Sequence, residues 1–123
     1  MAADELTADP ASFAERWLAA WNAHDLDAVL VLFHDDVVFT SPLAIKVVPE
    51  SEGILRGKDA LRAYWSAALK RVPDLHFELT RLFAGVDSLL IGFRMNGGPE
   101  RFEILRFRGD RVSEGHGTYR VET

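Results

Sequence analysis

The chain has 123 residues, of which 48% are hydrophobic and 27% are charged, so it is long enough for one domain with a single core. It contains no cysteine, which excludes disulfides, zinc–thiolate sites and cysteine nucleophiles. The net charge is -5 without any basic run, which argues against nucleic-acid binding, and no apolar run approaches the roughly 20 residues that span a bilayer. The acidic N-terminus lacks the layout of a signal peptide, so we expect a cytoplasmic protein without membrane contact.

The first third of the chain predicts two helices and a strand. Apolar residues recur at helical spacing from about Ser12 to Ala23, and residues 1–11 before them are expected to form a flexible extension. Asp25 is a suitable N-cap for a second helix. Residues 37–41 are rich in β-branched side chains, and Pro42 is expected to end the strand that they form. The apolar residues of the two helices are Phe13, Trp17, Ala20, Trp21, Leu26, Val29, Leu30 and Phe33.

The middle of the chain predicts a long loop, and the hydrophobic period changes after it. Two glycines and Pro49 interrupt residues 43–57, so we expect a long loop or an irregular hairpin that could cover a cavity. A third helix is predicted from Lys58 to about Arg71. Apolar and polar residues then alternate as in half-buried strands, and the sequence at 96–98, Asn-Gly-Gly, predicts a hairpin. The expected strands cover residues 75–80, 88–95, 101–107 and 111–119.

Helices followed by hairpin-linked strands predict an α+β fold. We expect three N-terminal helices packed on one face of a curved antiparallel sheet, in a single domain over residues 1–123. A bent sheet leaves a hollow between itself and the helices, where a ligand pocket can form.

Four segments carry a resemblance to a known family. They are RWLAAWNAHDLDAVLVLFHDDVVFTSP, GKDALRAYW, FELT and FEILRF, which occur in this order between residues 13 and 119. In this pattern the chain resembles the SnoaL-like and ketosteroid-isomerase-like proteins of the nuclear-transport-factor-2-like superfamily. The resemblance implies a cone-shaped α+β barrel, in which a mixed, mostly antiparallel sheet and three helices enclose a pocket.

The resemblance also implies where catalytic groups would lie. It places Ser41 where ketosteroid isomerases have an aspartate as general base, Trp17 where they have a tyrosine, and Glu103 where a neutral aspartate donates a hydrogen bond to the oxyanion. A serine hydroxyl cannot by itself remove a carbon-bound proton near neutral pH, whereas Trp17 keeps an N–H donor and Glu103 keeps a carboxyl. The usual steroid isomerisation is therefore not expected.

A replacement base is predicted on the last strand. Glu114, His116 and Thr118 share one side of that strand, and the resemblance implies that this side faces the pocket together with Glu103. We predict that His116, oriented by Glu114 or Glu103, performs acid–base chemistry on a small apolar molecule, as the histidine–carboxylate pairs of SnoaL-like cyclases and scytalone dehydratase relatives imply. The other predicted pocket residues are Trp17, Phe39, Ser41, Leu61, Tyr64, Trp65, Leu89, Ile91, Phe93, Leu105 and Thr118.

Structural interpretations of the same residues stay open. Glycines flank His116, and strand glycines often mark a bulge, which would reverse the side that His116 faces. Independently, Glu103 could simply pair with Arg101 or an adjacent arginine across strands.

The predicted roles of the tryptophans and the expected absence of a metal also have alternative interpretations. Trp17 and Trp65 could simply fill the core, because aromatic stripes at helical spacing usually do. We expect no cofactor and no metal, since the histidines show no ligand spacing, and a metal site made of Glu103, Glu114 and His116 is the weaker alternative.

The outer sheet face predicts a contact between copies of the chain. Arg94, Ile104, Arg106 and Arg108 mix aliphatic and arginine side chains there, which suits a homodimer interface. The alternative is a solvated arginine face, with Glu78 and Glu100 nearby.

Two classes of function remain. In the first, the chain is an enzyme of isomerase, dehydratase, cyclase or hydrolase type that acts on a small hydrophobic molecule. In the second, it is a noncatalytic ligand-binding or dimerisation module. Eleven arginines against three lysines are typical of a GC-rich bacterial source.

Overall fold

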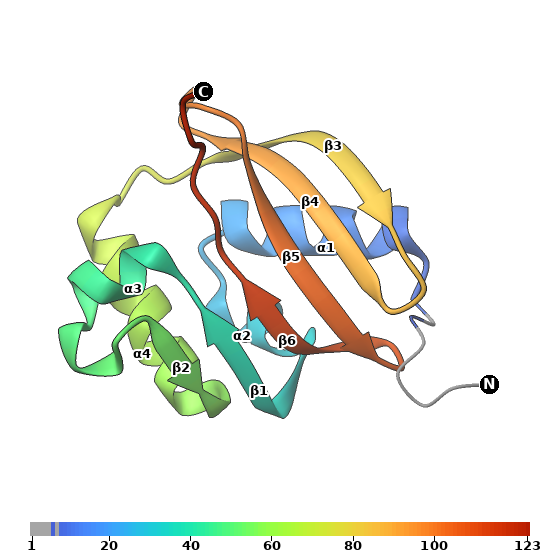
Figure 1. Cartoon of the computed structure of the whole chain (residues 1–123), viewed down its shortest axis with the longest axis horizontal. Helices are drawn as coiled ribbons and strands as arrows, with labels where there is room; N and C mark the ends of the chain where they lie inside the picture. Colours follow the sequence, from blue (N-terminus) through green and yellow to red (C-terminus); the bar gives the residue numbers. More distant parts are fainter. Residues whose placement is uncertain (1–5, 7) are drawn as a thin grey trace.

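The computed structural model describes residue 6 and residues 8–123, which form a curved, open sheet with helices packed against it (Figure 1). Four α-helices and six strands make up the structure and confirm the predicted α+β class. In chain order the elements are α1 (Pro10–Asn22), α2 (Leu26–Leu30), β1 (Phe33–Thr40), α3 (Pro42–Val47), the 3-10 helix η1 (Pro49–Ser51), β2 (Ile54–Arg56), α4 (Gly57–Arg71), β3 (Phe77–Ala84), β4 (Ser88–Met95), β5 (Arg101–Arg108) and β6 (Arg111–His116).

The first two helices begin at aspartate caps. The Asp9 carboxylate accepts a hydrogen bond from the Ser12 N–H at 2.9 Å, and the Asp25 carboxylate accepts one from the Ala28 N–H at 3.1 Å. The extension predicted over 1–11 lies mostly outside the described residues, and its last two residues already belong to α1. The second helix is shorter than predicted, because the chain turns after it and enters β1 at Phe33.

The segment over 43–57, predicted as a long loop or an irregular hairpin, contains regular structure, so the loop prediction is wrong while the antiparallel β1–β2 pair agrees with the hairpin. Pro42 and Pro49 each occupy the first turn of a helical element, α3 and η1, where the missing N–H of proline costs nothing. The chain then forms β2, which pairs antiparallel with β1 through Phe39 and Leu55. The prolines begin helical turns here instead of interrupting a loop.

The sheet is mixed and mostly antiparallel, as predicted. Its strand order is β2-β1-β6-β5-β4-β3, and the pairing of β1 with β6 is parallel while the other neighbours are antiparallel. Asn96 and Gly97, at the predicted hairpin, have φ values of 52° and 73°, which suit a tight turn between strands. The last strand ends at His116, three residues before the predicted position.

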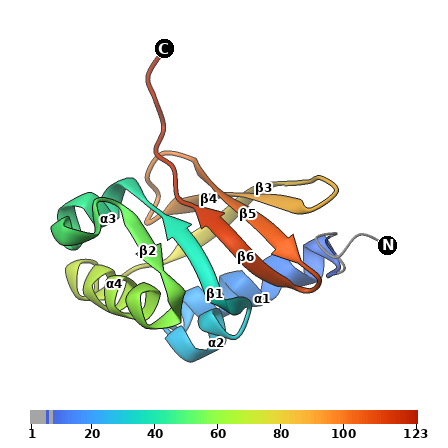
Figure 2. The same ribbon diagram turned by 60° about the horizontal axis from the view of Figure 1, so that its bottom comes forward.

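The helices and the inner face of the sheet form one core. Figure 2 shows α1, α2 and α4 on the same side of the sheet. Aromatic rings fill the space between these layers, with Trp17 stacked on Phe77 at 5.4 Å between ring centroids and Phe13 edge-on to Phe107 at 4.9 Å. None of the described helices has the length and apolar character needed to cross a membrane.

Candidate functional site

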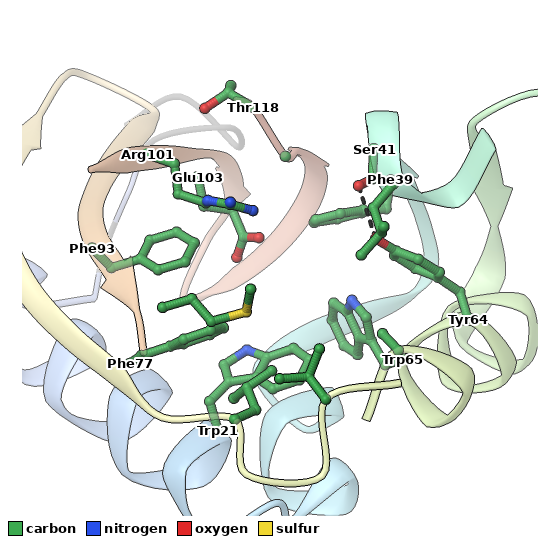
Figure 3. A pocket seen from close by; sticks show the side chains of 16 residues that line it. Trp21, Phe39, Ser41, Tyr64, Trp65, Phe77, Phe93, Arg101, Glu103 and Thr118 are labelled. Atoms are coloured by element: carbon green, nitrogen blue, oxygen red, sulfur yellow. Dashed lines mark hydrogen bonds between the residues drawn. The ribbon is translucent and has the colours of Figure 1, made fainter. Parts of the chain in front are cut away.

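A cavity of about 110 Å³ lies between the inner face of the sheet and helices α1 and α4 (Figure 3). Helix α1 contributes Trp21 to its wall and α4 contributes Tyr64 and Trp65, while four strands, α3 and the segments between elements supply most of the remainder. Six aromatic rings line the wall, those of Trp21, Phe39, Tyr64, Trp65, Phe77 and Phe93.

The end of α1 fixes part of this aromatic wall in place. The Asn22 side chain donates a hydrogen bond to the Phe77 carbonyl at 3.0 Å and accepts one from the Phe77 N–H at 2.7 Å, so α1 is tied to the start of β3. Trp21 then contacts Phe77 at 5.5 Å and meets Trp65 edge-on at 5.0 Å between ring centroids. Aromatic edge contacts of this kind hold both indoles in defined positions around the cavity.

The carboxyl of Glu103 extends from β5 into the cavity (Figure 3). Its residue is only 9% exposed, and it accepts a hydrogen bond from the Trp17 Nε1–H at 3.1 Å. Burial raises the pKa of Glu103 to about 7, and the hydrogen bond from Trp17 opposes this rise only in part. No ion pair joins Glu103 to a cation of the described residues, so the alternative pairing with Arg101 is not formed. The group can therefore both donate and accept a proton near neutral pH.

A neutral hydroxyl pair lies across the cavity from Glu103. The Ser41 and Tyr64 hydroxyls are 2.8 Å apart, and Ser41 is 8% exposed (Figure 3). Burial raises the pKa of Tyr64, which keeps its phenol protonated at neutral pH. One hydrogen of this pair is used between the two oxygens, so the other can be donated to a ligand.

Two further donors at the cavity have no hydrogen-bond partner among the described residues. Trp21 Nε1 and Arg101 Nε are buried and form no hydrogen bond within the described residues. Both side chains line the cavity, and such buried donors are costly to leave unmatched.

A wider mouth opens outward from the same place. Its volume is about 480 Å³, and it shares Ser41, Leu43, Arg101 and Thr118 with the inner cavity. Pro42, Lys46 and Tyr119 complete its lining.

The structure separates the predicted pocket residues into two groups. Phe39, Ser41, Tyr64, Trp65, Phe93 and Thr118 line the cavity together with Glu103. The others are fully buried in the core and do not line it: Trp17, Leu61, Leu89, Ile91 and Leu105. Trp17 still acts on the cavity indirectly, through its hydrogen bond to Glu103.

The predicted facing of Glu114 and His116 is wrong. His116 is the cross-strand partner of Ile104, and Glu114 is the partner of Arg106, so both lie on the outer face of the sheet. An extra residue, Ser113, stands between two successive register pairs of β6, and this bulge reverses the alternation of the strand.

On the outer face His116 has its own hydrogen-bond partners. Its Nε2 lies 2.7 Å from the Glu114 carboxylate and its Nδ1 lies 2.6 Å from the Thr40 hydroxyl. The sheet therefore separates the imidazole from Glu103, and the alternative metal site made of these acids and His116 does not assemble. Among the described residues no group of three or more His, Asp or Glu side chains could hold a metal ion.

Sequence reasoning missed several residues of the cavity wall. Trp21 is an apolar residue of the first predicted helix and Phe77 lies in the strand predicted over 75–80, but nothing in the pattern distinguishes the wall of a cavity from a filled core. The sequence pattern does indicate the inward facing of Arg101, because it lies on the same side of β5 as Glu103 and Leu105. The remaining missed residues are Ala68, Val72, Leu75, Met95 and Gly117, whereas Leu43 belongs to the segment expected to cover a cavity.

Comparisons with known proteins agree with this fold. A family model described as the SnoaL-like domain matches residues 14–123. A SnoaL-like protein of unknown function from Burkholderia thailandensis is 41% identical, with a TM-score of 0.84 over 91% of this chain and 94% of that chain. No curated protein shows a significant match.

Two more distant structures share the fold. An NTF2-like protein of unknown function from Burkholderia pseudomallei is 16% identical, with a TM-score of 0.68 over 93% of this chain and 92% of that chain. A proposed polyketide cyclase from Sinorhizobium meliloti is 15% identical, with a TM-score of 0.72 over 87% of this chain and 94% of that chain. The chain belongs to the SnoaL-like domain family.

Proposed function

We propose that this protein binds a small, mostly apolar molecule in the cavity and that Glu103 exchanges a proton with it. One observation carries the proposal: a carboxyl with a pKa of about 7 extends into a cavity lined by aromatic rings and forms no ion pair with any cation of the described residues. A carboxyl with an ordinary pKa would be almost fully ionised at neutral pH and could not act as an acid.

The arrangement suits removal of a proton from a carbon next to a carbonyl group. The Glu103 carboxylate takes the proton, the C–H bond breaks, and its electron pair forms an enolate whose charge collects on the oxygen. The Ser41–Tyr64 pair and the Trp21 Nε1–H supply neutral donors for that oxygen. Glu103 takes the role of proton acceptor, which Ser41 cannot fill.

Protonated Glu103 then completes the reaction. Return of the proton to a different carbon gives isomerisation, and its delivery to a departing hydroxide gives dehydration with release of water. Ring closure follows if the enolate carbon instead attacks a second carbonyl group of the same molecule, whose oxygen takes the proton. The common step of these reactions is the proton transfer at Glu103.

One observation favours a noncatalytic alternative. Glu103 is the single carboxyl among the described residues that line the inner cavity, and no histidine accompanies it. In this alternative the neutral Glu103 donates a hydrogen bond that only recognises the ligand.

Exchange of carbon-bound hydrogen distinguishes the two functions. We expect the wild-type protein to accelerate deuterium incorporation next to the carbonyl of phenylacetone in D2O, followed by NMR, and Glu103→Gln to lower the protein-dependent rate by roughly a hundredfold. Glu78→Gln, at an exposed position of β3, is the matched control and should retain the wild-type rate.

Binding of the ketone must be followed in the same samples. If phenylacetone shifts the indole resonances of Trp21 and Trp65 but the wild-type protein does not accelerate exchange, the noncatalytic alternative is correct. If it neither binds nor exchanges, this ligand class is wrong for the cavity.

A further inference from the structure

We propose that the natural ligand is a small carboxylic acid whose carboxylate binds Arg101 while its apolar body fills the inner cavity. The inference rests on the proposed binding of a small molecule in this cavity and adds the chemical class of that molecule. It starts from an arginine that the protein leaves without a counterion among the described residues.

Arg101 lacks the ion pair that three other arginines of the sheet form among the described residues. On the strands around it Arg81 pairs with Glu100, Arg106 with Asp87, and Arg108 with Asp36. Arg101 takes part in no ion pair within the described residues, and its Nε is buried without a hydrogen bond. A half-buried guanidinium without a partner is unfavourable, and a ligand anion would satisfy it.

The direction of the side chain agrees with this role. Arg101 begins β5 on the same face as Glu103, and its guanidinium extends over the cavity (Figure 3). It lines both the inner cavity and the mouth, so it stands at the junction between them. A ligand group held there would leave the remainder of the molecule among the aromatic rings.

The charge at the mouth supports an anion. The mouth is lined by two cations, Arg101 and Lys46, and by no carboxylate of the described residues. Lys46 takes part in no ion pair within the part of the chain that is described. The whole chain carries a net charge of -5, so this local excess of positive charge runs against the overall balance and would attract anions to the opening.

The volumes limit the size of the ligand. The inner cavity of about 110 Å³ is somewhat smaller than an engineered apolar cavity of roughly 150 Å³ that admits benzene. It therefore holds no apolar group larger than a single ring or a branched alkyl group. The mouth of about 480 Å³ leaves room for the carboxylate and a short linker.

Binding of an acid has a consequence for Glu103. A carboxylate at Arg101 places negative charge near the Glu103 carboxyl, which favours the protonated form of Glu103. The affinity for the acid should therefore rise as the pH falls from 8 to 6, while a neutral ligand of the same shape shows less dependence.

Phenylacetate and phenylacetamide form a matched pair of probes for titration calorimetry. We expect the wild-type protein to bind phenylacetate at least roughly tenfold more tightly than the amide at pH 6. Arg101→Gln should remove this preference without weakening the amide, and Arg101→Lys should keep part of it. Arg111→Gln, which removes an exposed arginine of β6, should leave both affinities unchanged.

The outcomes separate this inference from the proposed function. Equal affinities of the wild-type protein for acid and amide, with shifts of the Trp21 and Trp65 indole resonances, overturn the inference and leave the cavity function standing. An acid preference that persists in Arg101→Gln also overturns it. Absence of binding by both probes overturns the inference and the proposed cavity function together.

Discussion

Glu103 is the residue at which the fold and the proposed chemistry conflict. A carboxyl that is 9% exposed loses most of its hydration, and the Trp17 N–H replaces only part of it. The protein therefore favours the neutral form of the side chain, and ionisation of Glu103 lowers the stability of the fold. Functional groups often carry such a cost, because proton transfer near neutral pH requires a pKa far from its ordinary value.

This cost predicts a pH dependence of stability. The pKa of Glu103 is about 7 in the folded state and near 4.5 in the unfolded chain. Between pH 4.5 and pH 7, folded Glu103 therefore keeps a proton that the unfolded chain has lost. The free energy of unfolding should therefore fall by roughly 3 kcal/mol, relative to Glu103→Gln, as the pH rises from 4.5 through 7, and then stay constant. Urea titrations at several pH values measure this difference.

Glu100 provides a control with the opposite sign. Hydrogen bonds from Arg81 and Thr80 lower the pKa of Glu100 to about 2, so its contribution is present above pH 4.5 and is lost as the pH falls. The wild-type protein should thus be more stable than Glu100→Gln at neutral pH, with the difference shrinking in acid. A constant difference between wild type and Glu103→Gln across the whole range would contradict the buried, neutral state of Glu103.

At the scale of elements, the bulge in β6 determines which side chains of this strand face the cavity. Val112 and Gly115 both face inward although three positions separate them, because Ser113 is an extra residue in the ladder. Without the bulge, Glu114 and His116 would lie beside Glu103. With it, they face outward and a glycine takes the inward position beneath Phe39.

Regular strands could be predicted from the sequence, and this irregular one could not. In β4 and β5 the inward residues follow an unbroken alternation, so the facing of Phe93 and of Glu103 was predicted correctly. In β6 the inward positions around the bulge hold only Val112 and a glycine, so no hydrophobic alternation reveals the extra residue. Whether an inward side chain lines a cavity or fills the core, as Ile91 does, depends on packing depth, which a pattern along one strand does not contain.

The close contact at Gly115 gives a prediction about this element. A Cβ at Gly115 would lie 2.6 Å from Phe39 Cδ2 and 3.2 Å from Leu105 Cδ2, so Gly115→Ala should lower the free energy of unfolding by about 1–3 kcal/mol. In a Phe39→Ala background the ring is absent, and the same substitution should cost at least about 1 kcal/mol less. Urea denaturation of the four proteins of this cycle measures the coupling.

Gly92 supplies the control for that cycle. A Cβ there would lie 2.7 Å from the Thr80 hydroxyl and 2.9 Å from Phe102 Cε2, so the cost of Gly92→Ala should depend on these neighbours and not on Phe39. An equal cost of Gly115→Ala with and without the Phe39 ring would show that the contact does not restrict this strand.

At the scale of the whole molecule, a row of side chains crosses the outer face of all six strands. Successive register pairs join these residues, and the two ends of the row are well exposed, with Phe83 at 53% and Ile54 at 41%. Apolar side chains flank a polar centre at His116 and Thr40, an arrangement that can pair with a second copy of itself in the opposite direction. The row consists of Phe83, Leu90, Ile104, His116, Thr40 and Ile54.

We therefore expect the chain to form a homodimer through this outer face. Ile104→Glu should convert the dimer to a monomer, because it places a charge in the middle of the interface. Val86→Glu changes a side chain that is 78% exposed on the turn between β3 and β4 and should leave the dimer intact. Size-exclusion chromatography with light scattering distinguishes these states, and a monomeric wild-type protein at high concentration would refute the expected interface.

The position of β6 affects how the chain can fold during translation. It is the last of the six strands to leave the ribosome, yet it lies between β1 and β5 in the middle of the sheet. Until residues 111–116 emerge, the β1–β2 pair and the β3–β4–β5 meander of the nascent chain cannot be joined, and each keeps an open edge. Completion of the sheet, and with it of the wall that holds Phe39 and Glu103 in place, is therefore a late event in biogenesis.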